Sequence, residues 1–161
     1  VTVHLERAVC PDARSFADLV RRCYEVLQRA APLMSIEVLP RLEGEAAITV
    51  RGPEVQDVAA LGGTFDHLHV GHKMLLSVAA AVARRGLFVG ICGDSLLDGK
   101  QHAAGMQDWD TRAQGVLQFV ARLRPHLRVT VEVLNDPYGA ALRPEARTLV
   151  VSAETESGGA A

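Results

Sequence analysis

The sequence predicts an α/β protein in which a small α+β unit precedes a doubly wound parallel sheet. From residue 58 onward, short apolar runs alternate with amphipathic segments of helical spacing, which is typical of parallel strands joined by right-handed crossovers. Before that point the strand patterns are shorter, and Gly52-Pro53-Glu54 separates them from the rest. We therefore expect a unit over residues 1–51, a linker over 52–57 and the main domain over 58–161.

The expected N-terminal unit combines strands with one helix. Val1, Val3 and Leu5 alternate as in a strand, and two further alternating runs lie at 36–39 and 47–50. Between them, apolar residues at helical spacing predict an amphipathic helix that ends before Pro32: Phe16, Leu19, Val20, Cys23, Val26, Leu27 and Ala30.

The main domain is expected to contain strands over residues 58–61, 87–92, 127–134 and 148–152. One helix is predicted over about 70–85, closed by Gly86, and another over 108–124, stopped by Pro125. The polar, glycine-containing segment 93–107 follows the end of a strand, where ligands bind in such sheets.

Composition excludes several classes of protein. A net charge of -2 and 4% aromatic residues provide no basic, stacking surface for nucleic acid. No apolar run reaches the ~20 residues that would span a bilayer, so no membrane association is expected. Cys10, Cys23 and Cys92 are far apart and form no Cys-x-x-Cys pair, which favours free thiols in the cytoplasm. The chain lacks an initial Met and stops just after a strand pattern, so we expect it to be cut at both ends.

A glycine-histidine turn, Gly62 to His72, follows the first strand of the main domain. Gly62 and Gly63 can take positive φ and let backbone N–H groups approach an anion, toward which the next helix directs its dipole. His69 and His72 can face one ligand from the same side and stabilise charge on phosphate oxygens. The turn therefore predicts a phosphate-binding site.

Other interpretations of the turn remain open. Paired glycines often form a simple turn, and two histidines three positions apart also occur by chance. Asp66, His67, His69 and His72 include metal-ligand types, but their alternating spacing scatters the side chains, and the glycines fit phosphate better. We expect no protein-bound metal.

The run Gly62-Gly63-Thr64-Phe65-Asp66-x-Leu68-His69-x-x-His72-Lys73-x-Leu75-Leu76-Ser77-Val78-Ala79 resembles the nucleotidyltransferase superfamily with its His-x-Gly-His signature. It is more narrowly similar to phosphopantetheine adenylyltransferases of eukaryotic and archaeal type. Further similarities lie at Asp94 to Lys100, Arg112, Asp136 to Gly139 and Leu149 to Thr155, so the resemblance spans about residues 58–159.

The resemblance implies a Rossmann-like nucleotidyltransferase fold that transfers AMP from ATP, with Mg²⁺, to 4′-phosphopantetheine, giving dephospho-coenzyme A and pyrophosphate. It also implies a fused or partner dephospho-coenzyme A kinase. The implied catalytic residues are His72, Thr64 and Lys100. The implied ATP contacts are Gly62, Gly63, Thr64, Phe65, His69, Gly71, His72, Ser152, Glu154 and Thr155, and the implied acceptor contacts are Asp66, Lys100, Arg112 and Tyr138.

Several of these residues also fit a purely structural role. Lys100 fits a solvated surface, Arg112 fits an ion pair with Asp108 or Asp110, and Ser152 and Thr155 fit a helix cap. Members of the family continue with a Ser/Thr-rich basic element that closes over the triphosphate, whereas this chain ends before it, so we expect a C-terminally incomplete sheet, marginal stability and poor turnover. A cytidylyltransferase, a flavin-nucleotide synthetase and a non-catalytic scaffold remain alternatives.

Overall fold

The computed structural model describes residues 2–5, 9–30, 37–40, 42, 49–50, 55–97, 105–136 and 143–152. The first elements are β1 (Thr2–Leu5), β2 (Val9–Cys10), α1 (Ala13–Ala30), β3 (Glu37–Pro40) and β4 (Thr49–Val50). The following elements are β5 (Gln56–Gly63), η1 (Asp66–Leu68), α2 (Val70–Val82), β6 (Ala83–Cys92), η2 (Asp94–Leu96), α3 (Trp109–Leu123), β7 (Arg128–Leu134) and β8 (Thr148–Val150). The predicted site residues Lys100, Tyr138, Glu154 and Thr155 lie outside these described residues.

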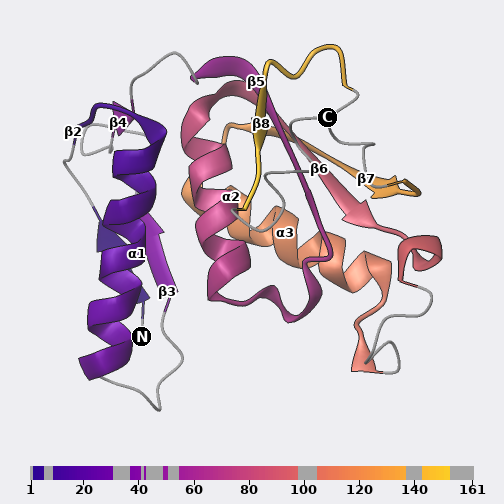
Figure 1. Ribbon diagram of the computed structural model, residues 1–161, viewed down its shortest axis with the longest axis horizontal. Helices are drawn as coiled ribbons and strands as arrows, with labels where there is room; N and C mark the ends of the chain where they lie inside the picture. Colours follow the sequence, from indigo (N-terminus) through magenta and orange to yellow (C-terminus); the bar gives the residue numbers. More distant parts are fainter. Residues whose placement is uncertain are drawn as a thin grey trace.

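The main sheet has four parallel strands in the order β7-β6-β5-β8 (Figure 1). The chain runs outward from β5 through β6 to β7 and then returns to β8 on the other side of β5, where Leu61 pairs with both Val89 and Val150. This reversal of direction is the doubly wound, Rossmann-like arrangement that the sequence predicts. In such sheets ligands bind outside the carboxyl ends of the strands, at the point where the order reverses.

Helices α2 and α3 pack together on one face of this sheet. The paired residues Leu61 and Val89 point to the same face and share one buried cluster with Ala79, Ala80 and Phe119 of the two helices. Because Ala79 and Ala80 have short side chains, α2 lies close to the strands. The amino end of α2 is thereby fixed at the carboxyl end of β5.

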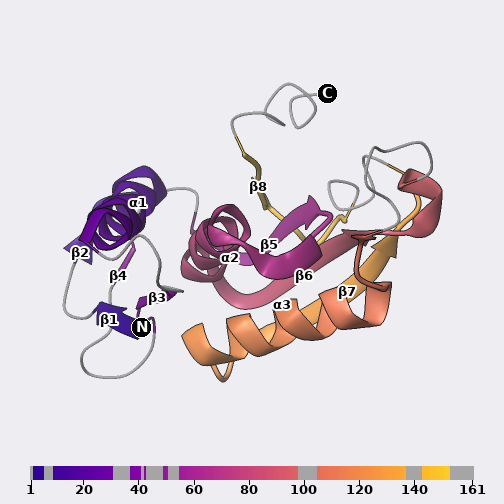
Figure 2. The ribbon, with the colours of Figure 1, turned by 90° about the horizontal axis from the view of Figure 1, so that it is seen from below.

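The N-terminal unit covers the opposite side of α2, as Figures 1 and 2 show. Here β1 pairs in parallel with β3, and β2 with β4. Phe16, Val20 and Tyr24 of α1 are buried, and the cluster that they form packs against a stripe of α2: Val70, Met74, Val78 and Ala81. The division of the chain near residue 51 stays a prediction; β5 begins at Gln56, inside the predicted linker.

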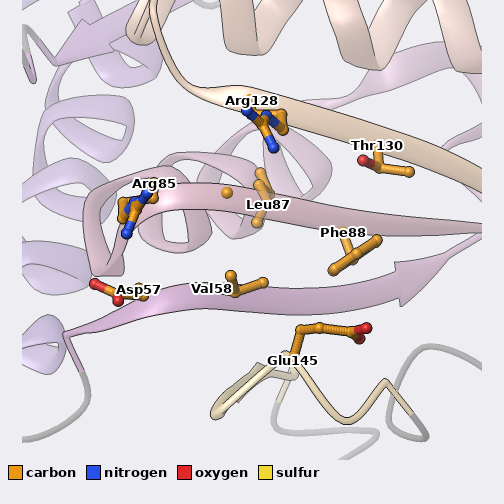
Figure 3. A pocket seen from close by; sticks show the side chains of 9 residues that line it. Asp57, Val58, Arg85, Leu87, Phe88, Arg128, Thr130 and Glu145 are labelled. Carbon is orange, nitrogen blue, oxygen red and sulfur yellow. The ribbon is translucent and has the colours of Figure 1, made fainter.

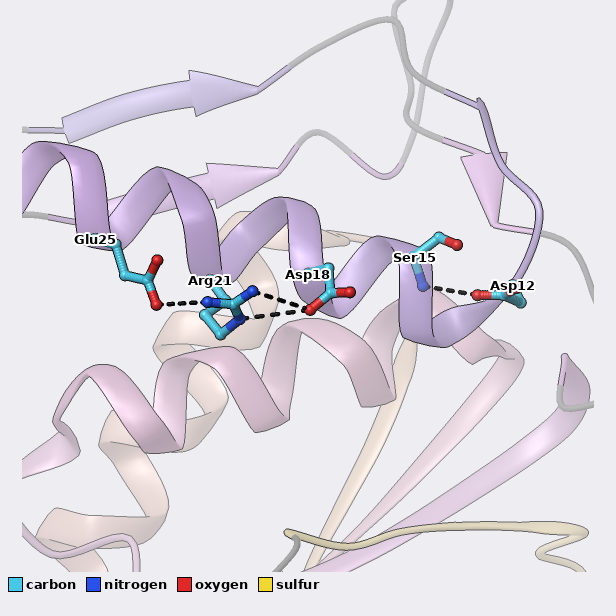
Figure 4. A network of polar contacts seen from close by, with 5 residues as sticks. All are labelled: Asp12, Ser15, Asp18, Arg21 and Glu25. Carbon is cyan, nitrogen blue, oxygen red and sulfur yellow. Dashed lines mark hydrogen bonds and ion pairs between the residues drawn. The ribbon is translucent and has the colours of Figure 1, made fainter.

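The outer face of α1 is charged, which confirms the amphipathic helix expected from the sequence. Asp12 accepts a hydrogen bond from the Ser15 N–H at 2.6 Å and caps the helix, while Arg21 bridges Asp18 and Glu25 (Figure 4). These exposed ion pairs contribute little to stability because water and salt screen them. None of the described helices combines the length and the apolar composition needed to span a lipid bilayer.

The helix predicted to run to Arg85 and to be closed by Gly86 ends earlier, at Val82, and β6 begins at once with extended Ala83. The reason lies at the far end of α3, where the Arg124 guanidinium donates to the carbonyls of Ala80, Ala83 and Arg84. A side chain therefore satisfies the carbonyls at the end of α2, and no glycine cap is needed. Gly86 instead lies within β6, paired with Val58 and Arg128.

Gly90 provides a test of packing within the sheet. A Cβ at this position would lie 2.5 Å from Leu134 Cδ2, so Gly90→Ala should lower the free energy of unfolding by about 1–3 kcal/mol in chemical denaturation. Gly115 in α3 is the matched control, because its Cβ would meet nothing within 4 Å, and Gly115→Ala should raise stability by roughly 0.5–1 kcal/mol. Equal effects of the two substitutions would contradict this packing.

Candidate active site

The glycine-histidine turn has an unusual backbone. After β5 ends at Gly63, Phe65 has φ 54° and ψ 27°, and His67 has φ 41° and ψ 56°. The left-handed conformation costs a non-glycine residue roughly 1–2 kcal/mol, so it persists only where the surroundings hold it. The strain therefore lies in the turn, at two residues that carry side chains.

The predicted positive φ at the glycines is wrong for Gly63. Gly62 and Gly63 are the last residues of β5, paired with Gly90 and Ile91, and the φ of Gly63 lies outside the left-handed region. A Cβ at Gly63 would lie 3.1 Å from the Phe65 ring. Glycine is required there because the buried ring of Phe65 folds back over it.

The two histidine rings of the signature lie together, as their spacing predicts. His69 precedes α2 as its N-cap residue, and its ring stacks on that of His72 with centroids 3.8 Å apart and planes 25° apart. A Cβ at Gly71 would lie 3.2 Å from His69 Cε1, so glycine makes room for the stack. Phe65 lies on another side of His72, with ring centroids 5.2 Å apart.

His72 is held neutral by its surroundings. Burial, followed by repulsion from His69, lowers its pKa to about 4, while Asp66 opposes this shift. Its Nδ1 is buried without a hydrogen-bond partner among the described residues. A buried polar atom without a partner is costly, and a ligand oxygen at this position would supply the missing bond.

Arg112 bonds to backbone carbonyls, whereas the sequence predicts either an acceptor contact or an ion pair. Its side chain is 1% exposed and donates three hydrogen bonds: from Nε to the Gln107 carbonyl at 3.0 Å, and from Nη1 to the carbonyls of Thr64 and Cys92 at 2.9 and 3.0 Å. It thus joins the ends of β5 and β6 to the segment before α3. Asp108 caps α3 by accepting from the Thr111 N–H, which lowers the pKa of that carboxyl.

Gln107 is a site residue that sequence reasoning missed. Its backbone N–H donates to Asp66 Oδ1 at 2.9 Å, and its side-chain oxygen accepts from the His67 N–H at 2.8 Å. His67 Nε2 also lies 3.2 Å from the Gly105 carbonyl. A glutamine in a polar loop carries no spacing signal, so only the fold shows this contact.

The described candidates gather at the carboxyl end of β5. The residues that the turn itself brings together are Gly62, Gly63, Thr64, Phe65, Asp66, His69, Gly71 and His72. Ser152 is exposed and comes just after β8, the strand that pairs with β5. Arg112 reaches the turn through Thr64.

A pocket of about 330 Å³ lies at the other end of the strands (Figure 3). Its lining includes Asp57, Arg85, Arg128 and Glu145, near the amino ends of β5, β6 and β7. Ligands of open α/β sheets bind at the carboxyl ends, where the strained turn lies. We therefore place the functional site at the turn.

A parallel sheet whose central strand leads through this strained turn to a His-x-Gly-His helix defines a protein of the nucleotidyltransferase class. A family model described as cytidylyltransferase-like matches residues 60–156. The chain belongs to this cytidylyltransferase-like family.

Curated relatives agree with the resemblance seen in the sequence. The phosphopantetheine adenylyltransferase of Saccharomyces cerevisiae is 46% identical over 102 residues, which cover 63% of this chain and 33% of that protein. The protein of the same name from Methanopyrus kandleri is 39% identical, over 60% of this chain and 60% of its own length. The one from Methanosarcina barkeri is 35% identical, over 60% of this chain and 59% of its own length. The chain thus spans about a third of the yeast relative and three fifths of the archaeal ones. No solved structure matches significantly.

The lowered pKa of His72 predicts a pH dependence of stability. The ordinary pKa of a histidine is 6.5, and the folded structure lowers that of His72 to about 4. At a pH between these two values, His72 binds a proton in the unfolded chain but not in the folded one. The contribution of His72 is therefore fully present above about pH 6.5 and is lost as the pH falls toward 4. When the pH is lowered from 7.5 to 5, the free energy of unfolding measured by urea denaturation should fall less for His72→Gln than for the unmodified protein.

The control for this experiment is His126→Gln, which removes an exposed histidine from the turn after α3 and keeps His72. It should retain the steeper pH dependence. An identical pH dependence in His72→Gln would show that the ring titrates normally.

Proposed function

We propose that this protein transfers AMP from ATP to 4′-phosphopantetheine, giving dephospho-coenzyme A and pyrophosphate. The observation that carries the proposal is the stacked pair His69 and His72 at the amino end of α2, beside the carboxyl end of the central strand. Relatives named phosphopantetheine adenylyltransferase support this choice of reaction.

Binding of the triphosphate follows from the amino end of α2. The first backbone N–H groups of a helix lack intrahelical partners and, with the helix dipole, attract anions. A phosphate oxygen beside His72 would accept a hydrogen bond from its ring and raise its pKa, because a negative charge favours the protonated imidazole. Burial would then strengthen this interaction relative to one in water.

Transfer needs positioning rather than a strong base. An oxygen of the acceptor phosphate, already an anion, attacks the α-phosphorus of ATP, while the bond from that phosphorus to the bridging oxygen breaks and pyrophosphate leaves. We assign charge stabilisation on the α-phosphate to His72 and Thr64, and on pyrophosphate or the acceptor phosphate to Lys100. Mg²⁺ would enter as the ion that accompanies ATP, held by phosphate oxygens and water.

The remaining expected contacts have different kinds of support. Asp66 lies in the turn and accepts a hydrogen bond from the Gln107 N–H, and its contact with the acceptor is assigned by resemblance. Ser152 comes just after β8, the strand next to β5, and the contacts of Ser152, Glu154 and Thr155 with adenine are assigned by resemblance. Tyr138 is assigned to the pantetheine arm by resemblance alone. A direct role of Arg112 toward the acceptor stays a prediction, and its bonds to carbonyls favour an indirect one.

The cellular setting follows from the reaction. We infer a cytoplasmic location, which free Cys10, Cys23 and Cys92 support because they suit a reducing compartment. The product carries a free 3′-hydroxyl on its adenosine, so a dephospho-coenzyme A kinase, fused or separate, is the expected next enzyme.

The proposal predicts that purified protein forms dephospho-coenzyme A from ATP and 4′-phosphopantetheine. His72→Ala should lower kcat by about 10²–10³-fold, as removal of one preorganised donor does in comparable sites, while circular dichroism stays unchanged. His126→Ala, an exposed histidine beyond the end of α3, should keep full turnover.

A nucleotide panel separates the proposal from its competitor. The description of the matching family as cytidylyltransferase-like makes CTP the relevant alternative donor. Turnover with CTP and a phosphorylated alcohol, in place of ATP and phosphopantetheine, would refute the adenylyltransferase assignment. Nucleotide binding without turnover of either pair would favour the scaffold.

A further inference from the structure

The strained turn is held from outside by hydrogen bonds from the next loop. Phe65 and His67 take left-handed conformations that ordinary residues avoid. The backbone of this turn is bonded on both sides of Phe65: the Thr64 carbonyl accepts from Arg112, and the His67 N–H donates to the Gln107 side chain. Both partners belong to the segment 107–112, which follows β6 in the chain.

Gln107 makes three hydrogen bonds of different kinds. Its side-chain oxygen accepts from His67 N–H, its N–H donates to the Asp66 carboxylate, and its carbonyl accepts from Arg112 Nε. Arg112 in turn bonds the ends of β5 and β6 through Thr64 and Cys92. Turn, loop and strand ends are therefore linked in one hydrogen-bond network that passes through Gln107.

We propose that Gln107 is a positioning residue that fixes the left-handed turn at His67 and so sets where His69 and His72 face the ligand. His67 lies between β5 and the first turn of α2, and a change of its φ and ψ would rotate the chain that leads to His69. Without the Gln107 acceptor, the turn would relax toward ordinary backbone angles. The histidine pair would then shift relative to the end of β5.

In the sequence, Gln107 follows Lys100, the residue assigned to pyrophosphate or to the acceptor, between β6 and α3. The catalytic consequence rests on the proposed adenylyl transfer, whereas the effect on the turn does not.

Gln107→Met tests the inference because methionine has similar length and no equivalent acceptor oxygen. Gln114→Met, on the exposed face of α3, is the matched control. The amide of His67 should exchange with solvent at least about tenfold faster in Gln107→Met than in the control, because its hydrogen bond is lost. Gln107→Glu retains an acceptor oxygen and should restore the protection.

Turnover gives the second readout. In Gln107→Met we expect kcat to fall by between about tenfold and 10²-fold, with ATP affinity within about twofold and the melting temperature near that of Gln114→Met. A merely structural role would instead lower the melting temperature and leave kcat per folded molecule unchanged, and that result would overturn the inference. Unchanged exchange at His67 would also overturn it. If the unmodified protein shows no adenylyl transfer, the proposed function fails, while the exchange measurement still decides whether Gln107 holds the turn.

Discussion

The burial of Phe65 is the constraint on which the candidate site depends. Its ring is 1% exposed, within the main core, although the residue lies in a turn between a strand and a helix. To bring the ring inward the backbone takes a left-handed conformation, and to make room for it the preceding strand ends in Gly63. The same ring lies beside His72 and takes part in the burial that keeps that imidazole neutral. The left-handed backbone at Phe65, the glycine at position 63 and the burial of His72 are thus linked through one apolar contact.

The order of strands and helices in the main domain could be predicted because each apolar run and each helical segment has a clear period. β7 and α3 begin and end within a residue or so of their predicted bounds. The turn from Gly62 to His72 was found because several weak signals coincide in it. Its internal geometry could not be predicted, since the position of positive φ depends on where the Phe65 ring packs.

Contacts between distant segments explain the other differences from the sequence prediction. The end of α2 at Val82 depends on Arg124, and Arg112 collects carbonyls from three segments. The sequence suggests an ion pair for Arg112, because aspartates stand beside it near the start of a helix. Hydrogen bonds to backbone carbonyls cannot be predicted in this way, since every residue has a carbonyl. Gln107 was missed for the same reason, because both of its partners in the turn are identified only by the fold.

The N-terminal unit bears on the site through α2, which has apolar contacts on two sides. The sheet covers Leu76, Ala79 and Ala80, while the cluster around α1 covers Val70, Met74 and Val78. Val70 is the first residue of α2, so this second contact reaches the end of the helix at which the histidine pair lies. Support of α2 is therefore a structural contribution of residues that match no part of the cytidylyltransferase-like family model.

Arginines near both ends of α3 donate hydrogen bonds to backbone carbonyls. Arg112 and Arg124 each donate to carbonyls, which every amino acid provides. Substitutions at the accepting residues therefore leave the acceptors in place, whereas lysine in place of either arginine would lose the planar fork of donors. These hydrogen bonds are asymmetric under mutation: they depend on the arginine side chains, but not on which side chain the accepting residue carries. A substitution at an accepting residue that leaves the backbone in place therefore keeps the bonds that align the strands and helices.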